Sequence, residues 1–195
     1  MHKIDEAKRG AFRALRIGTD PWVTPVTAEC LQDVGLLSTL TRWRGENMEG
    51  FPSVFTPTVE RTRTWLRDRI LDKPGRCLFL IYSDTRPIGQ VGVSIVDHET
   101  VEISDVIRGE VAEPGAMQAA LHSLRQWLYR AGTTYTQLRV FTDRFHAIRL
   151  YDQLDFRPTI LIPLARTETS QGEYAWTDAD GRRPERYFLL MRHAG

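Results

Sequence analysis

The sequence predicts a mixed α+β protein, in which helices flank a mostly antiparallel sheet that contains one parallel crossover. Three strand-like runs follow one another between residues 77 and 107, and the short turns between them are typical of antiparallel hairpins. An amphipathic helix comes next, and a strand follows it directly, as in a parallel crossover. The 195 residues, 42% of them apolar, are enough for a core. We expect a single domain over residues 1–195.

The first elements are the least regular. Residues 1–11 are polar and are expected to fray. A first strand is expected over 12–17, closed by Gly18. Residues 27–46 are predicted to be helical because apolar side chains recur at three-residue steps, and Gly35 allows a break in this helix.

A loop is expected from Gly45 to Pro52, and a second helix follows it. Thr56 is a suitable N-cap residue, and Pro57 suits the first helical position, where no amide donor is needed. Apolar residues at helical spacing continue this helix until just before Pro74.

The central strands are expected over 77–83, 88–96 and 101–107. The helix after them covers 115–131 and ends at Gly132, which can adopt the left-handed conformation of a C-terminal stop. One face of this helix is apolar, and it comprises Met117, Ala120, Leu121, Leu124, Leu128 and Ala131.

The last third of the chain is predicted to contain a strand at 135–142 and a helix capped by Asp143. Two final strands are expected over 156–165 and 186–192. The polar excursion between them, 166–185, is interpreted as a loop that forms either a lid or a dimer contact.

The composition argues against several classes of protein. No apolar run approaches the ~18 residues of a membrane span, and the charged N-terminus lacks the apolar stretch of a secretory signal. The net charge of +1 gives no support for a broad nucleic-acid surface. Cys30 and Cys77 are too few and too far apart for a disulfide framework or a metal cluster. The cytoplasm is the expected compartment.

Arginine dominates the basic residues, since Lys3, Lys8 and Lys73 are the only lysines among 26. The planar fork of arginine suits phosphate and carboxylate recognition. The alternative is that arginine simply takes the place of lysine across a neutral surface.

The strand 101–107, the loop to Gly115 and the helix after it form the first unit with chemical meaning. Unpaired amides at a helix N-terminus bind phosphate oxygens without needing a particular side chain. Gly115 permits close approach of the backbone, and Ala116 keeps the entrance small. The alternative is an ordinary turn before a helix.

The second unit is 138–156, a strand and an amphipathic helix that end in a chain reversal at Asp155. We expect Asp155 to adopt a left-handed conformation, which aspartate tolerates better than most residues. The apolar face of this helix carries Tyr151 beside Leu150. A tyrosine hydroxyl that points into a cleft can donate a proton.

Together these residues resemble the GNAT superfamily of acyl-CoA-dependent N-acyltransferases. The segment Ala147–Phe156 is similar to the A-x-x-L-Y-x-x-L/x-G-F segment of that superfamily. The strand 101–107 with Gly115, eight residues after Ile107, is similar to its pyrophosphate-binding loop.

The resemblance spans roughly residues 12–165 and includes features of one subgroup. Thr41–Arg44, Glu46–Asn47, Thr56–Pro57 and Trp65–Leu66 resemble the N-terminal half of that subgroup. It includes ribosomal-protein N-terminal acetyltransferases and acetyltransferases of nucleotide-linked amino sugars.

The chain departs from the superfamily pattern in the loop. Ala112 replaces a long polar residue, Met117 replaces a small one, and Glu113 adds a negative charge. Arg144 stands where asparagine is common, and Asp155 where glycine is usual. Arg108 and Arg144 are candidates to restore positive charge near the phosphates.

The resemblance implies acetyl-CoA as co-substrate and direct attack by a neutral amine. Glu102 and Asp105 are the candidate bases; three apart in a regular strand they face opposite sides, and Glu102 is slightly preferred. Tyr151 is placed to protonate the leaving thiolate, and a backbone N–H near Val106 to bind the oxyanion. The implied cofactor-binding residues are Val106, Ile107, Arg108, Gly115, Ala116, Met117, Gln118, Asp143, Arg144 and Ala147.

No metal is required, because His122 and His146 have no partner at metal-ligand spacing. The acceptor is expected near the end of the first helix, and the implied substrate-binding residues are Trp43, Arg44, Glu46, Asn47 and Phe51. Aromatic and arginine side chains there could stack on a base or sugar and hold a diphosphate. Trp43 has the alternative role of covering the core.

Three functions stay open. The first is N-acetylation of a primary amine on a small molecule, for example a nucleotide-activated amino sugar. The second is acetylation of a protein N-terminus, and the third is a catalytically idle module that binds CoA. No nucleic-acid or membrane partner is expected, and a homodimer is one outcome.

Overall fold

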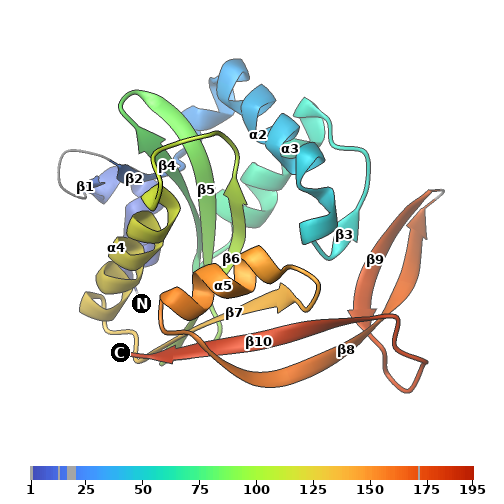
Figure 1. Ribbon diagram of the computed structural model, residues 1–195. Helices are drawn as coiled ribbons and strands as arrows, with labels where there is room; N and C mark the ends of the chain where they lie inside the picture. Colours follow the sequence, from blue (N-terminus) through green and yellow to red (C-terminus); the bar gives the residue numbers. More distant parts are fainter. Residues whose placement is uncertain (1, 13, 17–20, 171) are drawn as a thin grey trace.

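A computed structural model describes residues 2–12, 14–16, 21–170 and 172–195, and it is built on one ten-stranded sheet (Figure 1). The strand order is β1-β2-β4-β5-β6-β7-β10-β8-β9-β3. Of the described strand pairs, only β6 and β7 run parallel. The predicted mixed α+β class with one parallel crossover is therefore confirmed. The strands are β1 (Leu15–Arg16), β2 (Trp22–Pro25), β3 (Ser53–Val54), β4 (Arg76–Ser83), β5 (Arg86–Ile95), β6 (Thr100–Arg108), β7 (Tyr135–Phe141), β8 (Arg157–Ser170), β9 (Glu173–Asp178) and β10 (Arg186–Ala194).

Helices cover both faces of the central strands. The α-helices are α1 (His2–Glu6), α2 (Val34–Glu46), α3 (Val59–Trp65), α4 (Ala116–Arg130) and α5 (Phe145–Gln153). Shorter 3-10 and π-helical segments are η1 (Ala7–Ala11), η2 (Ala28–Gln32), η3 (Met48–Gly50) and η4 (Leu66–Leu71). No described helix is long and apolar enough to cross a membrane.

The strand β4 shows how the two faces are filled. Phe79 and Ile81 pack into one core with residues of α1 and α4, whereas Leu78 and Leu80 pack into a second core with α2 and η4. Alternate side chains of a strand point to opposite faces, so a strand covered on both sides is apolar throughout. Burying these side chains stabilises the fold by ~1.5–3 kcal/mol each.

The strands β6 and β7 separate part-way along their length, and this separation positions the site. They pair only from Thr100 to Ile103 on β6, opposite Tyr135 to Leu138 on β7. Beyond Leu138, the register of β7 continues with β10 alone. In Figure 1, α5 lies across β7 beside this opening.

A bulge shapes β6 at the same level. The register with β5 shifts between Gln90 and Gly92, so that β6 has one residue more than β5 there. Asp105 lies in the bulge with a φ of 50°, a conformation that aspartate tolerates. The bulge ends the strict alternation of side chains that the sequence predicted for β6.

Residues 2–11 are helical, so the fraying expected for residues 1–11 is not found in them; residue 1 lies outside the described residues. Ile4 and Ala7 are 3% and 1% exposed and belong to the core under α4. The ammonium of Lys8 donates to the carbonyls of Ile70 and Lys73 and pairs with Asp5. A long lysine stem can be buried while its charged end reaches polar partners, which composition alone does not reveal.

The predicted first strand, 12–17, is reduced to β1, and residues 13 and 17–18 of the prediction lie outside the described residues. The strand that joins the main sheet is β2, which pairs with β4 and which the sequence analysis missed. Prolines at positions 21 and 25 argued against a strand in the sequence. Proline is nevertheless tolerated at the end of a strand, and β2 lies next to β1, which has only two residues.

The first two predicted helices begin differently in the structure. The region predicted as helical from residue 27 contains the short segment η2 and then α2 from Val34, and the second helix is capped two residues later than predicted. Asp33, rather than Gly35, marks the break in the first helical region, and its carboxylate caps α2 by accepting from the Leu36 amide. Thr58, rather than Thr56, caps α3 by accepting from the Arg61 amide. In each case the oxygen that satisfies an unpaired amide fixes the start.

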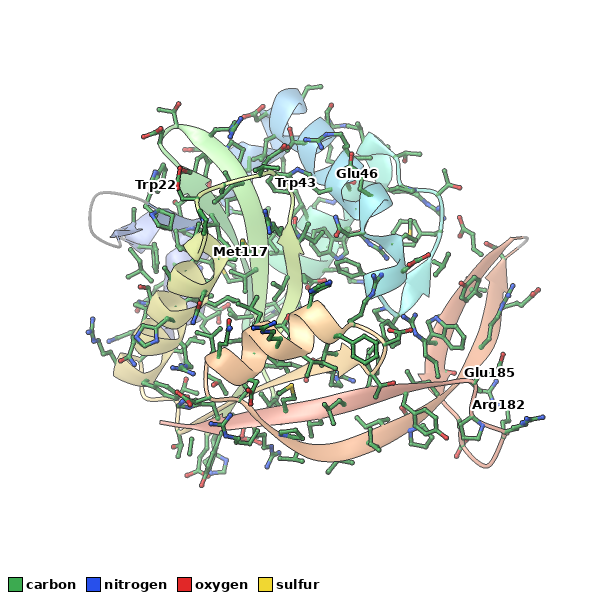
Figure 2. The ribbon with its side chains drawn as sticks, viewed as in Figure 1. Trp22, Trp43, Glu46, Met117, Arg182 and Glu185 are labelled. Atoms are coloured by element: carbon green, nitrogen blue, oxygen red, sulfur yellow. The ribbon has the colours of Figure 1, made fainter. Side chains whose placement is uncertain are left out.

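The C-terminal region corrects two further predictions. The Asp143 carboxylate does not cap α5; it pairs with Arg186 at 2.8 Å. The excursion 166–185 is not a loop, because β8 extends to Ser170 and β9 pairs with β8 and β3. Its remaining turn contains Arg182 and Glu185, which Figure 2 labels at the edge of the molecule. The predicted left-handed conformation at Asp155 is confirmed by a φ of 63°.

Candidate active site

A cleft of about 1440 Å³ opens where β6 and β7 separate. Its walls come from β6, β7, the loop before α4 and the first turns of α5. Most of the predicted cofactor-binding residues border it, namely Val106, Arg108, Gly115, Ala116, Met117, Gln118, Asp143, Arg144 and Ala147. Ile107 does not, because its side chain is buried in the core beneath α2.

The N-terminus of α4 presents backbone donors to this cleft. Gly115 is the N-cap with a φ of 86°, and an added Cβ would meet nothing within 4 Å. The first helical bond joins the Ala119 amide to the Gly115 carbonyl, and the Met117 and Gln118 amides find no acceptor in the described part of the chain. Two open amides at the positive end of a helix suit phosphate oxygens.

Charged side chains around this N-terminus have both signs. Arg108 is exposed on the cleft wall and has no ion-pair partner among the described residues. Glu113 also borders the cleft and is exposed. Figure 2 shows Met117 at the start of α4, beside the central strands.

The helix α5 brings Tyr151 to the cleft. Its ring is 7% exposed and packs edge-on against Phe156, with the ring centroids 6.2 Å apart. Its hydroxyl has no hydrogen-bond partner among the described residues, and burial raises the pKa of the phenol above its ordinary value. The hydroxyl therefore stays protonated at neutral pH and can donate into the cleft.

Arg144 and Asp143 lie at the other end of α5 and are already engaged. Arg144 pairs with Glu49 at 3.5 Å, while its buried Nε has no partner in the structure. Arg186 holds Asp143 and stacks on Phe141 at 3.4 Å. These contacts tie the start of α5 to η3 and β10.

Both candidate bases border the cleft, contrary to the expected opposite orientation of Glu102 and Asp105. The bulge at Asp105 is the reason, because it turns the strand between the two positions. Glu102 is 9% exposed, pairs with Arg139 at 2.7 Å and accepts from Gln137 at 3.1 Å. Its two carboxylate oxygens are both occupied.

Asp105 has a weaker set of partners. Ser104 donates to it at 3.0 Å, and Arg76 lies 3.8 Å away. Burial raises the pKa of its carboxyl, and the hydrogen bond from Ser104 and the charges of Arg76 and Arg44 oppose the shift. A carboxylate with a raised pKa is a stronger base than an exposed one.

A model of the acetyltransferase (GNAT) family matches residues 40–156, which is more than half of the chain and includes β6, α4 and α5. The chain belongs to the GNAT acetyltransferase family. The predicted family and enzyme class are confirmed. No curated protein matches the sequence.

Solved structures with the GNAT fold superpose on nearly the whole chain, whereas the family model matches only residues 40–156. A RimL ribosomal L7/L12 alpha-N-protein acetyltransferase in complex with coenzyme A superposes with a TM-score of 0.68 at 13% identity, over 93% of this chain and 98% of that one. A probable GNAT acetyltransferase from Chromobacterium violaceum gives 0.70 at 16%, over 93% and 90%. An acetyl transferase from Salmonella typhimurium that modifies the N-terminal serine of L7/L12 gives 0.68 at 11%, over 94% and 99%. These likenesses show the fold.

The predicted substrate-binding residues of this GNAT chain fall into two groups. Asn47 and Phe51 border the cleft. Trp43 is fully buried in the core and donates to Glu110 at 2.9 Å, so its alternative role as a core residue is the one observed. Glu46 is exposed, borders neither cavity and pairs with Arg42. Figure 2 labels Trp43 and Glu46 on α2.

A second cavity of about 210 Å³ adjoins the cleft. Asp105, Phe51, Pro52 and Ser53 border both, so these four residues form a wall that the two spaces share. Its other wall residues come from α2, α3, β5 and the segment before α3, and they are Leu40, Arg44, Phe55, Arg61, Thr62, Trp65 and Gln90.

Sequence analysis named only Arg44, Phe51 and Asp105 as site residues of this second cavity and missed the others, among them Phe55, Arg61 and Gln90. Two phenylalanines and one arginine between 51 and 61 were the available signal for the first two. Gln90 gave none, because it reaches the site only through the bulge, where its amide donates to the Asp105 carbonyl at 3.2 Å. No group of His, Cys, Asp or Glu that could hold a metal occurs among the described residues.

Proposed function

We propose that the protein transfers an acetyl group from acetyl-CoA to a primary amine. The observation that carries this proposal is one cleft bordered by helix N-terminal amides, a protonated tyrosine and a half-buried carboxylate, that of Asp105. The coenzyme supplies the thioester that the amine attacks. A structural neighbour solved in complex with coenzyme A agrees with this proposal.

The residues present fit a pantetheine-linked diphosphate. The open amides of Met117 and Gln118 would hold its phosphate oxygens, and Arg108 would add positive charge. The gap between β6 and β7 leaves backbone of both strands for the extended arm. Gly115 leaves the approach open, since nothing lies within 4 Å of where its Cβ would be.

Asp105 would accept the proton of the attacking ammonium, directly or through water. A free amine with a pKa near ~10.4 is almost wholly protonated at neutral pH, so a base is needed. Asp105 is favoured over Glu102 because it borders both cavities, whereas Glu102 is fully engaged with Arg139 and Gln137. This choice reverses the slight preference that the sequence gave.

Tyr151 would donate a hydrogen bond or proton to the departing thiolate, whose pKa is ~8.5 when unperturbed. A backbone amide at the β6 bulge, most simply that of Val106, would bind the negative charge that develops on the carbonyl oxygen. Holding the amine and the thioester together would supply the remaining part of the rate enhancement. In well-oriented systems this effect lowers the activation free energy by up to ~7–11 kcal/mol.

The acceptor is a separate question. Two arginines on the second cavity agree with an anionic acceptor, yet its volume of about 210 Å³ is small for a whole nucleotide-linked sugar. A protein N-terminus finds support in the likeness to ribosomal-protein acetyltransferases, which is a likeness of fold. We therefore propose a small amine as the acceptor.

Incubation with acetyl-CoA and pools of amines tests the activity through release of free thiol, and calorimetry with coenzyme A tests binding. We expect thiol release that depends on the amine and binding of about one coenzyme per chain. Binding without thiol release for any amine would support the idle module instead. A chain that ignores coenzyme A altogether would end the proposal.

A further inference from the structure

The second cavity is bordered by a half-buried guanidinium, that of Arg44, which makes no ion pair with the described residues. Arg44 lies between the rings of Phe51 and Phe55, with its central carbon 4.1 Å and 4.9 Å from the two ring centroids. Its remaining contacts are neutral: it donates to the Ser53 carbonyl at 2.5 Å and approaches the Met48 sulfur at 3.1 Å. No carboxylate lies within ion-pair distance of Arg44 among the described residues.

The other cation of the cavity is neutralised. Arg61 forms a two-pronged contact with Glu173 at 2.5 Å and 3.0 Å. Arg76 on the cleft side lies near Asp105. Of the two arginines on the second cavity, Arg44 is therefore the one that makes no ion pair with the described residues.

A charge partly withdrawn from water without an ion pair is costly, and desolvation lowers the pKa of Arg44 to about 10 while the nearby charge of Asp105 opposes the shift. The two flanking rings fix the guanidinium plane, which limits the rearrangement needed to bind a planar anion. A carboxylate matches this fork with two parallel hydrogen bonds.

The same cavity is also bordered by a complementary charge. Among the described residues, Asp105 is the only acidic residue that borders it, and Asp105 borders the cleft as well. A molecule in this space would thus meet a cation at Arg44 and an anion at Asp105. Phe51, Phe55 and Trp65 contribute apolar rings to the lining.

We infer that the acceptor is a small amine that also carries a carboxylate, with the carboxylate on Arg44 and the amine beside Asp105. The inference rests on the proposed acetyl transfer and narrows its acceptor to amino-acid-like molecules. The volume of about 210 Å³ suits a molecule of that size. An acidic residue at a peptide N-terminus has the same chemistry, and the experiment separates the two sources.

Matched acceptors test the inference on the unaltered protein. Amino acids are compared with their amides, and β-alanine with propylamine, by thiol release from acetyl-CoA. The neutral acceptor of each pair cannot form the charge-assisted bond to Arg44. We therefore expect kcat/KM for the carboxylate to be about 10- to 100-fold higher than for its matched neutral acceptor. Short peptides with an acidic first residue and a nucleotide-linked amino sugar complete the panel.

The variant Arg44→Met keeps the stem and removes the charge. We expect it to abolish the preference for carboxylates while coenzyme A binding, measured by calorimetry, stays unchanged. Arg69→Met is the matched control, because Arg69 is exposed on η4 and borders neither cavity. The binding of an N-acetylated carboxylate product, followed through the fluorescence of Trp65, provides a readout apart from turnover.

The outcomes distinguish the two proposals. Equal rates for carboxylates and amides, or acetylation of only the peptides or the nucleotide sugar, would overturn the inference and leave acetyl transfer standing. Absence of coenzyme A binding would overturn acetyl transfer itself. If Arg44→Met does not fold, the matched acceptors on the unaltered protein still decide the matter.

Discussion

At the β6 bulge, Asp105 combines a φ of 50° with burial that raises the pKa of its carboxyl. Asparagine adopts this left-handed conformation as readily as aspartate does, so Asp105→Asn removes the charge and leaves the backbone unstrained. The substitution therefore separates the chemistry of the carboxylate from its structural cost.

We expect Asp105→Asn to lower kcat by about 100-fold or more, because the base is lost. The variant should also melt at a higher temperature at neutral pH. A raised pKa means that ionisation opposes folding; this cost is absent below the unfolded-state pKa and complete above the folded-state pKa. The difference in stability should thus disappear as the pH falls, and the rate of the unaltered enzyme should fall over the same range.

Glu102→Gln is the comparison for this experiment. It breaks the ion pair with Arg139 yet keeps the contact with Gln137, so we expect a smaller loss of kcat. A large loss in Glu102→Gln together with an active Asp105→Asn would assign the base to Glu102.

Tyr151→Phe tests the proton donor. We expect kcat to fall by about 100-fold while KM for the amine stays within a factor of two. The free energy of unfolding should change by less than about 0.5 kcal/mol, because the hydroxyl has no hydrogen-bond partner among the described residues. Steady-state kinetics and thermal denaturation check both. Unchanged turnover would remove Tyr151 from the mechanism.

Among the elements, α4 has glycines with positive φ at both ends, and these allow a matched pair of variants. Gly115 has a φ of 86° and Gly132 a φ of 95°, and an added Cβ meets nothing within 4 Å at either. Any effect of a side chain there comes from backbone strain of ~1–3 kcal/mol rather than from a clash.

Gly115→Val is expected to weaken coenzyme A binding by about 10-fold or more, because relief of the strain moves the Met117 and Gln118 amides. Gly132→Val should cost comparable stability and leave that affinity unchanged. Calorimetric titration and thermal denaturation measure the two effects. Equal affinities for the two variants would place the diphosphate elsewhere.

The elements that the sequence predicted well are those whose pattern reflects local physics. The helix α4 and the strands β4 to β6 carry clear periodicity, and the match of α5 to a family segment identified Tyr151. The start of α3 depended on whether the hydroxyl of Thr56 or that of Thr58 accepts a hydrogen bond from a helix amide, and Thr58 does so. The burial of Ile4 and the pairing of β9 with β3 depend on distant partners, and no local pattern encodes them.

The site followed the same rule. The main cleft depends on a helix N-terminus and a strand end that are near in sequence, so its residues could be predicted. The second cavity joins α2, α3, β5 and the β6 bulge, which only the tertiary fold brings together. The only sequence feature that indicates the bulge is an aspartate within a predicted strand.

For the whole molecule, the strand order brings an early segment to the far edge of the sheet. The strand β3, which comes from the connection between α2 and α3, pairs with β9 at the other end from β1 (Figure 1). The Trp176 amide donates to the Pro52 carbonyl at 2.7 Å, and Glu173 holds Arg61. Residues 52 and 61 are thus held by residues of β9 that lie more than a hundred positions later in the chain.

Glu173→Gln tests whether this ion pair holds β9 to α3. We expect amide exchange at Trp176 to become several-fold faster, while the global melting temperature stays close to that of the unaltered protein because the pair is partly exposed. Glu168→Gln on β8, which breaks only a surface pair with Arg166, is the matched control.

The pH dependence of that exchange gives an independent check. The hydrogen bond from Arg61 holds the pKa of Glu173 at about 2, below the ~4.3 of an unfolded glutamate. The contribution of the pair is therefore complete above the unfolded-state pKa and is lost as the pH falls through the folded-state value. Exchange rates of the unaltered protein and Glu173→Gln should differ by a constant factor from pH 8 to pH 5 and converge toward pH 2. A factor that changes near neutral pH would show that another group controls the docking of β9.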